Sequence, residues 1–444
     1  MANKSASAVG RLQNDARSLA INALNTCQKG MSAQEALDLT LAKPGVQDRE
    51  KALCTELFYG SLRADLRIEY ILSVFLKNPG KLPPSMISIL KLALYSLLFL
   101  TRQPEYAPVS WAVETVGNVF GKPLAGLANA VLRNFLRTGE APRRLDFYKK
   151  PSDIDELAAQ ARFYSLPFWL AAFWRESCPG HYLNLMQRSF QRPRPALRLN
   201  RQKAEAALLA ADATRAGLEQ VLPWAFSSAN CPLPDPFNAK GIQELHRHGL
   251  LSWQAAGSQM VMSELFTEIS GGPIWDACAG VGGKSLWLLE NGFDCSLASD
   301  ISEKRLSRIS SECRRLGLNS PTLFVGSPEA IFAWEGHILI DAPCSGLGVL
   351  ARRPDILLHA AKEGSGILKK HLAQQRHLLD RSAEIISPGF NIIYITCTLN
   401  HFENEDQVQS FLARHPDFSL LKVWQSSTGH PWLEGMFGAV LQKK

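Results

Sequence analysis

The chain has 444 residues and a formal net charge of +7, with 46% hydrophobic and 20% charged residues. This length exceeds what one hydrophobic core organises, so it predicts two or three domains and excludes a small disulfide-stapled protein. Residues 1–150 contain 20 Lys and Arg against 12 Asp and Glu, and this local excess favours an anionic partner such as a nucleic acid.

The first segment, 1–17, is polar and has no apolar signal core, so we expect a cytoplasmic protein. The longest apolar stretch, 86–100, contains Lys91 and is shorter than the ~18 residues that a membrane span needs. It predicts a buried helix and no membrane partner. The nine cysteines form no CxxC pair, so we expect no metal.

Residues 10–140 have apolar side chains at helical spacing, as at Val109, Ala112 and Val116, and no period-2 run interrupts them. We therefore predict an all-α domain over 1–143. Its basic charge makes it a candidate RNA-binding domain.

A linker rich in proline and cations begins near residue 141, and 144–245 is predicted to be a small mixed α/β module. Six cations with no acid between them stand within 188–203, interspersed with Phe190. Such a pattern suits a nucleic-acid backbone with stacked bases, although a solvated pair of strands is an equal alternative. The candidate RNA-binding residues are Arg188, Arg192, Arg194, Arg198, Arg201 and Lys203.

Strand-like and helical patterns alternate after residue 246, which predicts a parallel, doubly wound sheet in a Rossmann-like domain over 246–444. The expected strands are 274–276, 295–299, 337–340 and 391–395. A helix is expected from about Lys284, and a longer one over about 366–387. We expect the whole protein to be a monomer.

A glycine-rich turn, ACAGVGG at 277–283, follows the first of these strands. Such a turn lets backbone N–H groups approach a ligand near the positive end of a helix dipole. Asp300 ends the next strand, where Rossmann-like folds bind ribose hydroxyls. Together they predict a cofactor that contains a nucleoside. A plain turn with a helix N-cap is the alternative.

Two cysteines follow two other predicted strands: Cys344 in DAPCSG at 341–346, and Cys397 in TCT at 396–398. Ligands bind at the carboxyl edge of such sheets, so both thiols and Asp341 are expected there. A nucleophilic thiol, a carboxyl group and a group that assists elimination are what methylation of cytosine C5 requires. Lys284 is a candidate source of positive charge that lowers the pKa of the attacking thiol. Inert core thiols and a solvated lysine are the alternatives.

Several segments together resemble the Sun/Fmu (RsmB-type) family of 16S rRNA cytosine-C5 methyltransferases. They are DACAGVGGK at 276–284, DAPCSGLG at 341–348, RPD at 353–355, TCT at 396–398 with Glu403 and Asn404, and GMFGAVL at 435–441. Upstream, FYGSLR at 58–63, KLALY at 91–95 and LANAVLR at 127–133 resemble a NusB-type RNA-binding domain.

The resemblance implies that Cys397 attacks C6 of cytosine, that Asp341 engages N3, and that Cys344 assists release of the product. It also implies S-adenosylmethionine as the cofactor, small-subunit rRNA as the partner, and a target base turned out of its stack. The implied cofactor-binding residues are Cys278, Ala279, Gly280, Val281, Gly282, Gly283, Lys284, Asp300, Ser327 and Asp341.

The departures from the family pattern all concern the cofactor side. Gly280 and Val281 replace an alanine and a proline, so the loop is less preorganised. The family usually has an acid after its third strand, and Ser327 stands near that position in this chain. The acid that often follows the glutamine matching Gln254 in the family is also absent. The nucleophile also has an alternative, because DNA cytosine-C5 methyltransferases use a Pro-Cys motif, which would select Cys344.

Two other functions were weighed. A non-catalytic RNA-binding assembly or antitermination factor with a decayed methyltransferase domain would explain the altered cofactor residues and predicts no cofactor binding. A nicotinamide-dependent oxidoreductase is disfavoured by the glycine spacing and the paired thiols. Methylation of exocyclic amines is disfavoured because DAPC at 341–344 occupies the place of the Asn/Asp-Pro-Pro-Tyr/Phe motif.

Overall fold

The computed structural model describes residues 15–229 and 237–444, which form two compact units. The helical unit comprises the described part of Met1–Arg192 together with Leu350–Ser365. The sheet unit comprises the described part of Pro193–Val349 together with Gly366–Lys444. The predicted module 144–245 therefore contributes residues to both units. Most of the polar segment on which the expected location rests, residues 1–14, lies outside the described residues.

The described residues of the helical unit contain helices and no strand, which agrees with the predicted all-α domain. Local sequence sets several ends: the Asp15 side chain caps α2 (Ala16–Gln28), and Pro84 begins α6 (Pro84–Phe99). The helices are α2 (Ala16–Gln28), α3 (Ala33–Leu41), α4 (Asp48–Arg63), α5 (Asp65–Phe75), α6 (Pro84–Phe99), α7 (Tyr106–Phe120), α8 (Lys122–Arg137), α9 (Glu156–Phe163), α10 (Phe168–Ser177), α11 (Tyr182–Phe190) and α17 (Asp355–Glu363). Short 3-10 turns lie at Pro79–Lys81, Ala141–Arg143 and Leu145–Tyr148.

Helix α17 is far in sequence from the other helices of this unit, yet it folds with them. Leu358 packs against the core of the helical unit, which includes Leu57 and Phe58 of α4. The Trp169 indole N–H donates to the carbonyl of Ala360 at 2.9 Å. The segment after the Cys344 motif is therefore part of the helical unit.

The sheet unit begins with a small antiparallel sheet in the order β2-β3-β1-β4. Its strands are β1 (Ala196–Leu199), β2 (Glu219–Leu222), β3 (Ala225–Ser227) and β4 (Leu251–Trp253), accompanied by helices α12 (Ala206–Arg215) and α13 (Ala239–Arg247). Leu197, Leu199 and Phe226 are buried in its core, so β1 is not the solvated strand that its cations suggested.

The larger sheet has seven strands in the order β10-β11-β9-β8-β5-β6-β7. They are β5 (Ile274–Asp276), β6 (Cys295–Asp300), β7 (Thr322–Val325), β8 (His337–Asp341), β9 (Asn391–Thr396), β10 (Phe418–Gln425) and β11 (Phe437–Lys443). The predicted parallel, doubly wound sheet is present, with the exception of β11, which runs antiparallel to both neighbours. The five strands from β9 to β7 are parallel, as predicted.

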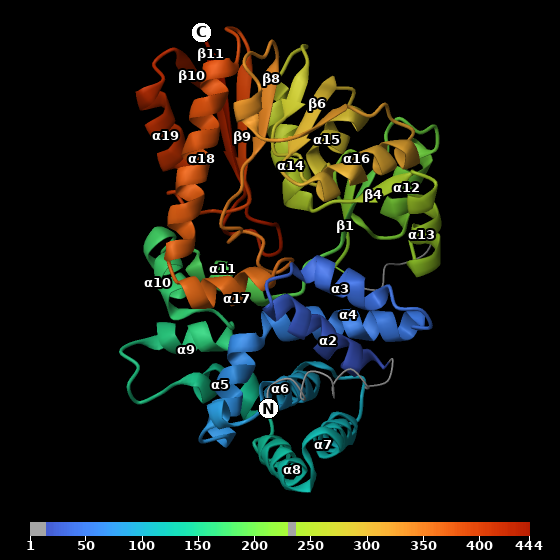
Figure 1. The fold of residues 1–444 in the computed structure, drawn as a ribbon, viewed down its shortest axis with the longest axis vertical. Helices are drawn as coiled ribbons and strands as arrows, with labels where there is room; N and C mark the ends of the chain where they lie inside the picture. The colour runs from blue at the N-terminus through green and yellow to red at the C-terminus, as the bar shows by residue number, and fades with distance from the viewer. Residues whose placement is uncertain (1–14, 230–236) are drawn as a thin grey trace. The chain divides into compact units, whose positions relative to one another are not determined.

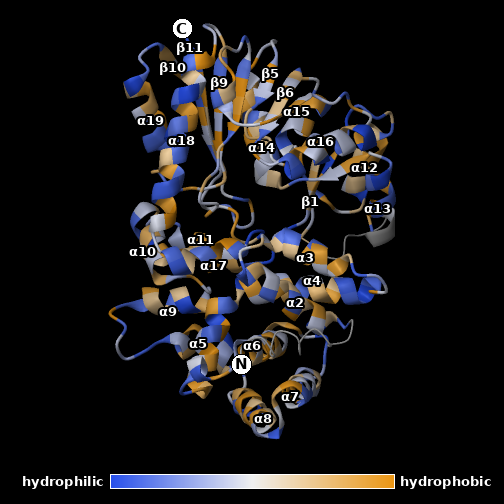
Figure 2. Cartoon of the chain, viewed as in Figure 1, coloured by the Kyte–Doolittle hydropathy of each residue, from blue (hydrophilic) through white to orange (hydrophobic). Residues whose placement is uncertain are grey.

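Helices cover both faces of this sheet: α18 (Gly366–Ile385) and α19 (Glu405–Arg414) lie on one face, with α14 (Ala256–Leu265), α15 (Gly283–Glu290) and α16 (Glu303–Leu316) on the other (Figure 1). Alternate residues of β9 point to opposite faces, Ile392 and Tyr394 to one core, Ile393 and Ile395 to the other. A strand buried on both faces has a continuous apolar sequence, whereas the covering helix α18 mixes hydrophilic and hydrophobic residues (Figure 2).

Strand order fixes where a ligand can bind in the sheet unit. From β5 the chain proceeds through β6 to β7 in one direction, and β8 and β9 lie on the other side of β5. The carboxyl ends of β5 and β8 therefore flank the switch point of the sheet, the usual crevice for ligands in such folds. None of the described helices is long and apolar enough to cross a membrane. Nor do three or more described His, Cys, Asp or Glu side chains gather as a metal site requires.

Candidate active site

The two cysteine motifs lie at the ends of neighbouring parallel strands, β8 and β9. Their sulfur atoms, Cys344 Sγ and Cys397 Sγ, are 3.1 Å apart. The backbone N–H of Cys397 also donates to Cys344 Sγ at 3.2 Å. The structure thus brings together the two thiols that the sequence placed at one edge of the sheet.

The two sulfurs differ in their surroundings. The hydrogen bond with Cys397, burial, and the nearby negative charge of Glu403 together raise the pKa of the Cys344 thiol well above its ordinary value. Cys344 therefore keeps its proton at neutral pH. Cys397 instead interacts electrostatically with the ammonium group of Lys284. The two sulfurs therefore differ in that only Cys397 is placed within the electrostatic influence of a buried cation.

A buried carboxylate, Glu403, joins the loops that carry the two thiols. It is fully buried and accepts hydrogen bonds from the backbone N–H of Ser345 at 2.8 Å and from the Ser345 hydroxyl. It also accepts hydrogen bonds from Gln375 Nε2 at 2.9 Å and from Asn400 Nδ2. Four donors satisfy the two oxygens, so a buried charge is stable here and fixes the Cys344 loop against the Cys397 loop.

The loop after Cys397 is held from other sides as well. Asn404 Oδ1 accepts from the Thr396 hydroxyl at 2.6 Å, and Asn404 Nδ2 donates to the carbonyl of Thr398 at 3.1 Å. The Gly348 N–H donates to the carbonyl of Cys397 at 3.0 Å. The backbone on both sides of Cys397 is therefore rigidly positioned.

Lys284 and Asp341 form an ion pair across the switch point, with Lys284 Nζ 2.5 Å from Asp341 Oδ2. Burial alone would lower the pKa of the Lys284 ammonium, but the attraction of Asp341 and their hydrogen bond hold it above its ordinary value. The Lys284 side chain is 9% exposed to solvent, whereas the Asp341 side chain is 36% exposed. A cation is thus fixed in the site, with a carboxylate that still faces solvent.

The glycine loop from Cys278 to Gly283 connects β5 to α15 and leaves open space beside it. Gly280 and Gly282 both have positive φ, +56° and +88°, which explains the need for glycine at each. A Cβ on Gly280 would meet no heavy atom within 4 Å. Cys278 and Ala279 are directed towards the protein interior, and burial raises the pKa of the Cys278 thiol. The backbone on the Gly280 side is therefore open to a ligand.

Asp300, at the end of β6, lies beside this loop as predicted. Its Oδ2 accepts from the Gly280 N–H at 3.0 Å. Its Oδ1 accepts from the Ser302 N–H at 2.8 Å and pairs with Arg305 at 2.8 Å. Oδ2 has only one of these partners, so it keeps a lone pair that could accept from a hydroxyl group.

The position after β7 differs from the other predicted ligand positions. Ser327 begins the turn at Pro328–Ala330, and its hydroxyl hydrogen-bonds to the Glu329 carboxylate. Glu329 also contacts His377 Nε2 at 2.5 Å, so this carboxylate is already held by the protein. The hydroxyl of Ser327 and the carboxylate of Glu329 are thus both engaged with protein partners at this strand end.

Asp276, which ends β5, is fully buried, and burial raises its pKa to about 7 although the Ser285 hydroxyl donates to it at 2.6 Å. Below pH ~4 the carboxyl group is protonated in both the folded and the unfolded chain. Between pH ~4 and ~7 only the unfolded chain releases the proton, so the folded state loses stability as pH rises.

We expect Asp276→Asn to remove this loss, which amounts to about 4 kcal/mol by linkage. The measurement is the free energy of unfolding at pH 4.5 and 7.5, in parallel with Asp294→Asn, a change to an exposed carboxylate. The loss should disappear in the first variant and persist in the second. Equal pH dependence in Asp276→Asn and the unsubstituted protein would contradict the assignment.

The structure corrects the set of six cations predicted to contact phosphates. Arg198 is buried in β1, where it forms an ion pair with Glu290 of α15 at 2.6 Å. Arg188 is also buried. Because both side chains are buried, neither can contact a phosphate in solvent, and the prediction was wrong for both. The sequence pattern did not indicate that they are core residues.

The other four cations are at least partly exposed, and they belong to different units. Arg192, in the helical unit, pairs with Glu56 at 3.1 Å. In the sheet unit Arg194 pairs with Glu219 at 2.9 Å, and Arg201 contacts Asn291 Oδ1 at 3.1 Å. The stretch 188–203 is therefore not one continuous cationic strand within a single unit.

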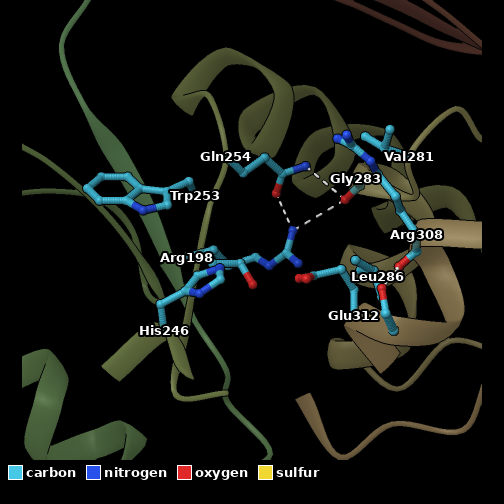
Figure 3. A pocket seen from close by; sticks show the side chains of 11 residues that line it. Arg198, His246, Trp253, Gln254, Val281, Gly283, Leu286, Arg308 and Glu312 are labelled. Carbon is cyan, nitrogen blue, oxygen red and sulfur yellow. Dashed lines mark hydrogen bonds between the residues drawn. The ribbon is translucent and has the colours of Figure 1, made fainter. Parts of the chain in front are cut away.

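Arg198 belongs instead to a network behind the glycine loop. Its Nη1 donates to the side-chain oxygen of Gln254 and lies 3.4 Å from the carbonyl oxygen of Gly283. Gln254 Nε2 donates to the same carbonyl at 3.1 Å (Figure 3). Sequence reasoning missed this role, as it missed that of Glu403, because in each case the partners are distant in sequence.

Comparison with known proteins gives the chain two regions of similarity. The family described as "16S rRNA methyltransferase RsmB/F" matches residues 267–435, and the NusB family matches residues 14–137. Among curated proteins, Ribosomal RNA small subunit methyltransferase B of Vibrio cholerae is 30% identical over 91% of this chain and 92% of its own. The protein of that name from Klebsiella pneumoniae strain 342 is 32% identical, over 91% of both chains.

Among solved structures, one titled "Crystal Structure of PH0851" aligns with 97% of this chain and 99% of its own. The TM-score is 0.74 and the sequence identity is 20%. At that identity the likeness concerns the fold, which extends over both units of the chain.

Proposed function

This chain belongs to the RsmB/F family of 16S rRNA methyltransferases, enzymes that methylate rRNA with S-adenosylmethionine, and we propose that it methylates C5 of a cytosine in small-subunit rRNA. The observation that carries the proposal is the pair of thiols 3.1 Å apart at the ends of β8 and β9. A carboxylate, Asp341, and a buried cation, Lys284, lie at the same edge of the sheet. Methylation of a nitrogen or a hydroxyl group would require neither thiol.

The residues present fit S-adenosylmethionine, which supplies an electrophilic methyl group when bound. The open backbone at Gly280 and the lone pair on Asp300 Oδ2 suit the amino-acid and ribose parts of such a ligand. Ser327 lies at the end of the next strand, where it would meet the base. We assign Cys278 to Lys284, Asp300, Ser327 and Asp341 to this site.

Cytosine C5 is a poor nucleophile, and addition of a thiolate to the neighbouring C6 makes it reactive. In the first step Cys397 Sγ forms a bond to C6, and the electron pair of the C5–C6 double bond becomes available at C5. A proton shared between Asp341 and N3 neutralises the charge that the addition brings to the ring, and Lys284 holds the Asp341 carboxyl group in place. C5 would then bond to the methyl carbon as the bond from that carbon to the sulfur of the cofactor breaks, with its electron pair left on the sulfur.

Release reverses the addition. A base from solvent, such as a water molecule, takes the proton from C5, the C5–C6 double bond re-forms, and the S–C6 bond breaks with its electron pair returning to Cys397. Cys344 is protonated and 3.1 Å from Cys397 Sγ, so it can donate a hydrogen bond to the departing thiolate. This assigns nucleophilic attack to Cys397 and assistance of release to Cys344.

The experiment is transfer of labelled methyl from S-adenosylmethionine to small-subunit rRNA that lacks the modification, followed by mapping of 5-methylcytosine. Free rRNA and small-subunit particles are both tested. We expect incorporation at one cytosine. Absence of incorporation into either substrate, together with absence of cofactor binding, would instead favour a non-catalytic RNA-binding protein.

The exposed cations at the start of the sheet unit give a separate prediction about RNA affinity. If Arg201 and Lys203 contact phosphates, the double change Arg201→Gln with Lys203→Gln should weaken rRNA binding. It should also reduce the slope of log K against log salt by about 1.4, or 0.7 for each contact to a single strand. Filter binding at several salt concentrations measures both quantities. An unchanged slope would assign these cations to a solvated surface.

A further inference from the structure

The glycine loop has little intrinsic rigidity of its own. Gly280 and Gly282 both adopt positive φ, and Val281 between them is about half exposed (46%). Glycines lose more conformational freedom on ordering than any other residue. Contacts from outside the loop must therefore hold it in one conformation.

Those contacts hold the loop at several places. The Ala279 N–H donates to the carbonyl of Ser299 at 2.9 Å, and the Gly280 N–H donates to Asp300 Oδ2 at 3.0 Å. At its end the carbonyl of Gly283 faces two donors, Gln254 Nε2 at 3.1 Å and Arg198 Nη1 at 3.4 Å (Figure 3). Both donors to the Gly283 carbonyl come from the small sheet: Arg198 lies in β1, and Gln254 directly follows β4.

Arg198 is held firmly enough to serve as an anchor. Its Nε and Nη2 donate to the two carboxylate oxygens of Glu290 at 2.6 and 3.1 Å. Both side chains are almost fully buried, 4% and 2% exposed. Arg198 thus contacts Gly283 at the first turn of α15 and Glu290 at its last residue. A guanidinium can form this bidentate pair and still direct a third nitrogen elsewhere.

A cavity of about 460 Å³ lies beside this network, lined in part by Trp253, Gln254, Val281 and Arg308. The cavity leaves space beside the loop, so the hydrogen bonds of Gln254 and Arg198 to the Gly283 carbonyl are the support that the loop has on this side.

We propose that Arg198 is a positioning residue for the cofactor loop: through Gln254 and the Gly283 carbonyl, it holds the loop from Cys278 to Gly283 in the conformation that binds S-adenosylmethionine. The inference rests on the proposed cofactor site. It makes the small sheet a part of that site, where the charge pattern alone had predicted an RNA contact.

The test uses the full-length Arg198→Lys protein. Lysine keeps the charge beside Glu290 but cannot reach Glu290, Gln254 and Gly283 together. We expect the dissociation constant and KM for S-adenosylmethionine to rise about tenfold, as for loss of one charge-assisted hydrogen bond. The rRNA dissociation constant and kcat at saturating cofactor should stay within about twofold. Gln254→Ala should act in the same direction, and the double variant should show less than the sum of the two effects, since both act on one carbonyl.

The matched control is Arg315→Lys. Arg315 also joins the small sheet to a helix of the large sheet: it pairs with Glu312 and donates to the carbonyls of His246 and Leu251. Its hydrogen bonds to other described residues do not reach the glycine loop, and it acts on Glu290 only through its charge. Its loss should lower the melting temperature without changing cofactor affinity.

Two results would overturn the inference: an unchanged cofactor dissociation constant in Arg198→Lys, or equal rises in Arg198→Lys and Arg315→Lys that follow their melting temperatures. The second would reduce Arg198 to a stabilising residue. If the unsubstituted protein binds no S-adenosylmethionine, the proposed function itself fails, which is a distinguishable result.

Discussion

Cys397→Ala is expected to abolish methyl transfer to rRNA. Without Cys397 Sγ no bond to C6 can form, C5 is not activated, and the rate should fall by about 10³-fold or more. The protein should also lose covalent capture of RNA that contains 5-fluorocytosine, because fluorine at C5 blocks release only after a thiol adduct has formed. Both are measured on one preparation, by label incorporation and by denaturing electrophoresis of the protein–RNA adduct.

The control is Cys313→Ala, which removes a buried thiol from the same unit outside the candidate site. It should retain both activities if the protein folds. Cofactor affinity should be similar in the Cys397→Ala variant and the unsubstituted protein, which separates loss of chemistry from loss of fold. Retained capture in Cys397→Ala would contradict the assignment and move the nucleophile to Cys344.

Cys344→Ala should have a different effect: attack proceeds and release fails. The sulfur of Cys344, 3.1 Å from Cys397 Sγ, is lost, so the departing thiolate has no thiol hydrogen bond to stabilise it and the S–C6 bond persists. We expect protein to accumulate on ordinary, unfluorinated rRNA as an adduct that survives denaturation, and multiple turnover to stop after about one methyl per enzyme.

Comparison of single and multiple turnover distinguishes this outcome from a general defect. The first methyl transfer should be close to normal in Cys344→Ala, and only later turnovers should be lost. Normal release with an undiminished steady-state rate would refute the role of Cys344. The double variant Cys344→Ala with Cys397→Ala should form no adduct, since the attacking thiol is absent.

The parts of the site that could be predicted from the sequence are those set by strand ends. Apolar runs before Asp276, Asp300 and Asp341 gave the strands, and parallel strands bring their carboxyl ends to one edge. The same reasoning brought Cys344 and Cys397 together, and the structure places their sulfurs in contact. The local pattern suffices for these residues because any residue at the carboxyl end of a parallel strand lies at the same edge of the sheet.

The supporting residues could not be predicted because their meaning depends on partners distant in sequence. Arg198 belongs to a cationic run, and only Glu290, in a different element, makes it a buried residue. Glu403 belongs to a motif that carries the family resemblance, but the motif does not reveal its role, which depends on Ser345 and Gln375, both far from it in sequence. The reversed direction of β11 was also missed, because strand periodicity does not report direction.

The chain passes between its two units three times, at 192/193, 349/350 and 365/366. The helical unit is therefore not a detachable module at the start of a gene. A truncation that began at Pro193 would keep α17 but remove the core on which Leu358 packs. Removal of the whole helical unit would therefore have to delete two separated stretches of the chain, the residues up to 192 and residues 350–365, at once.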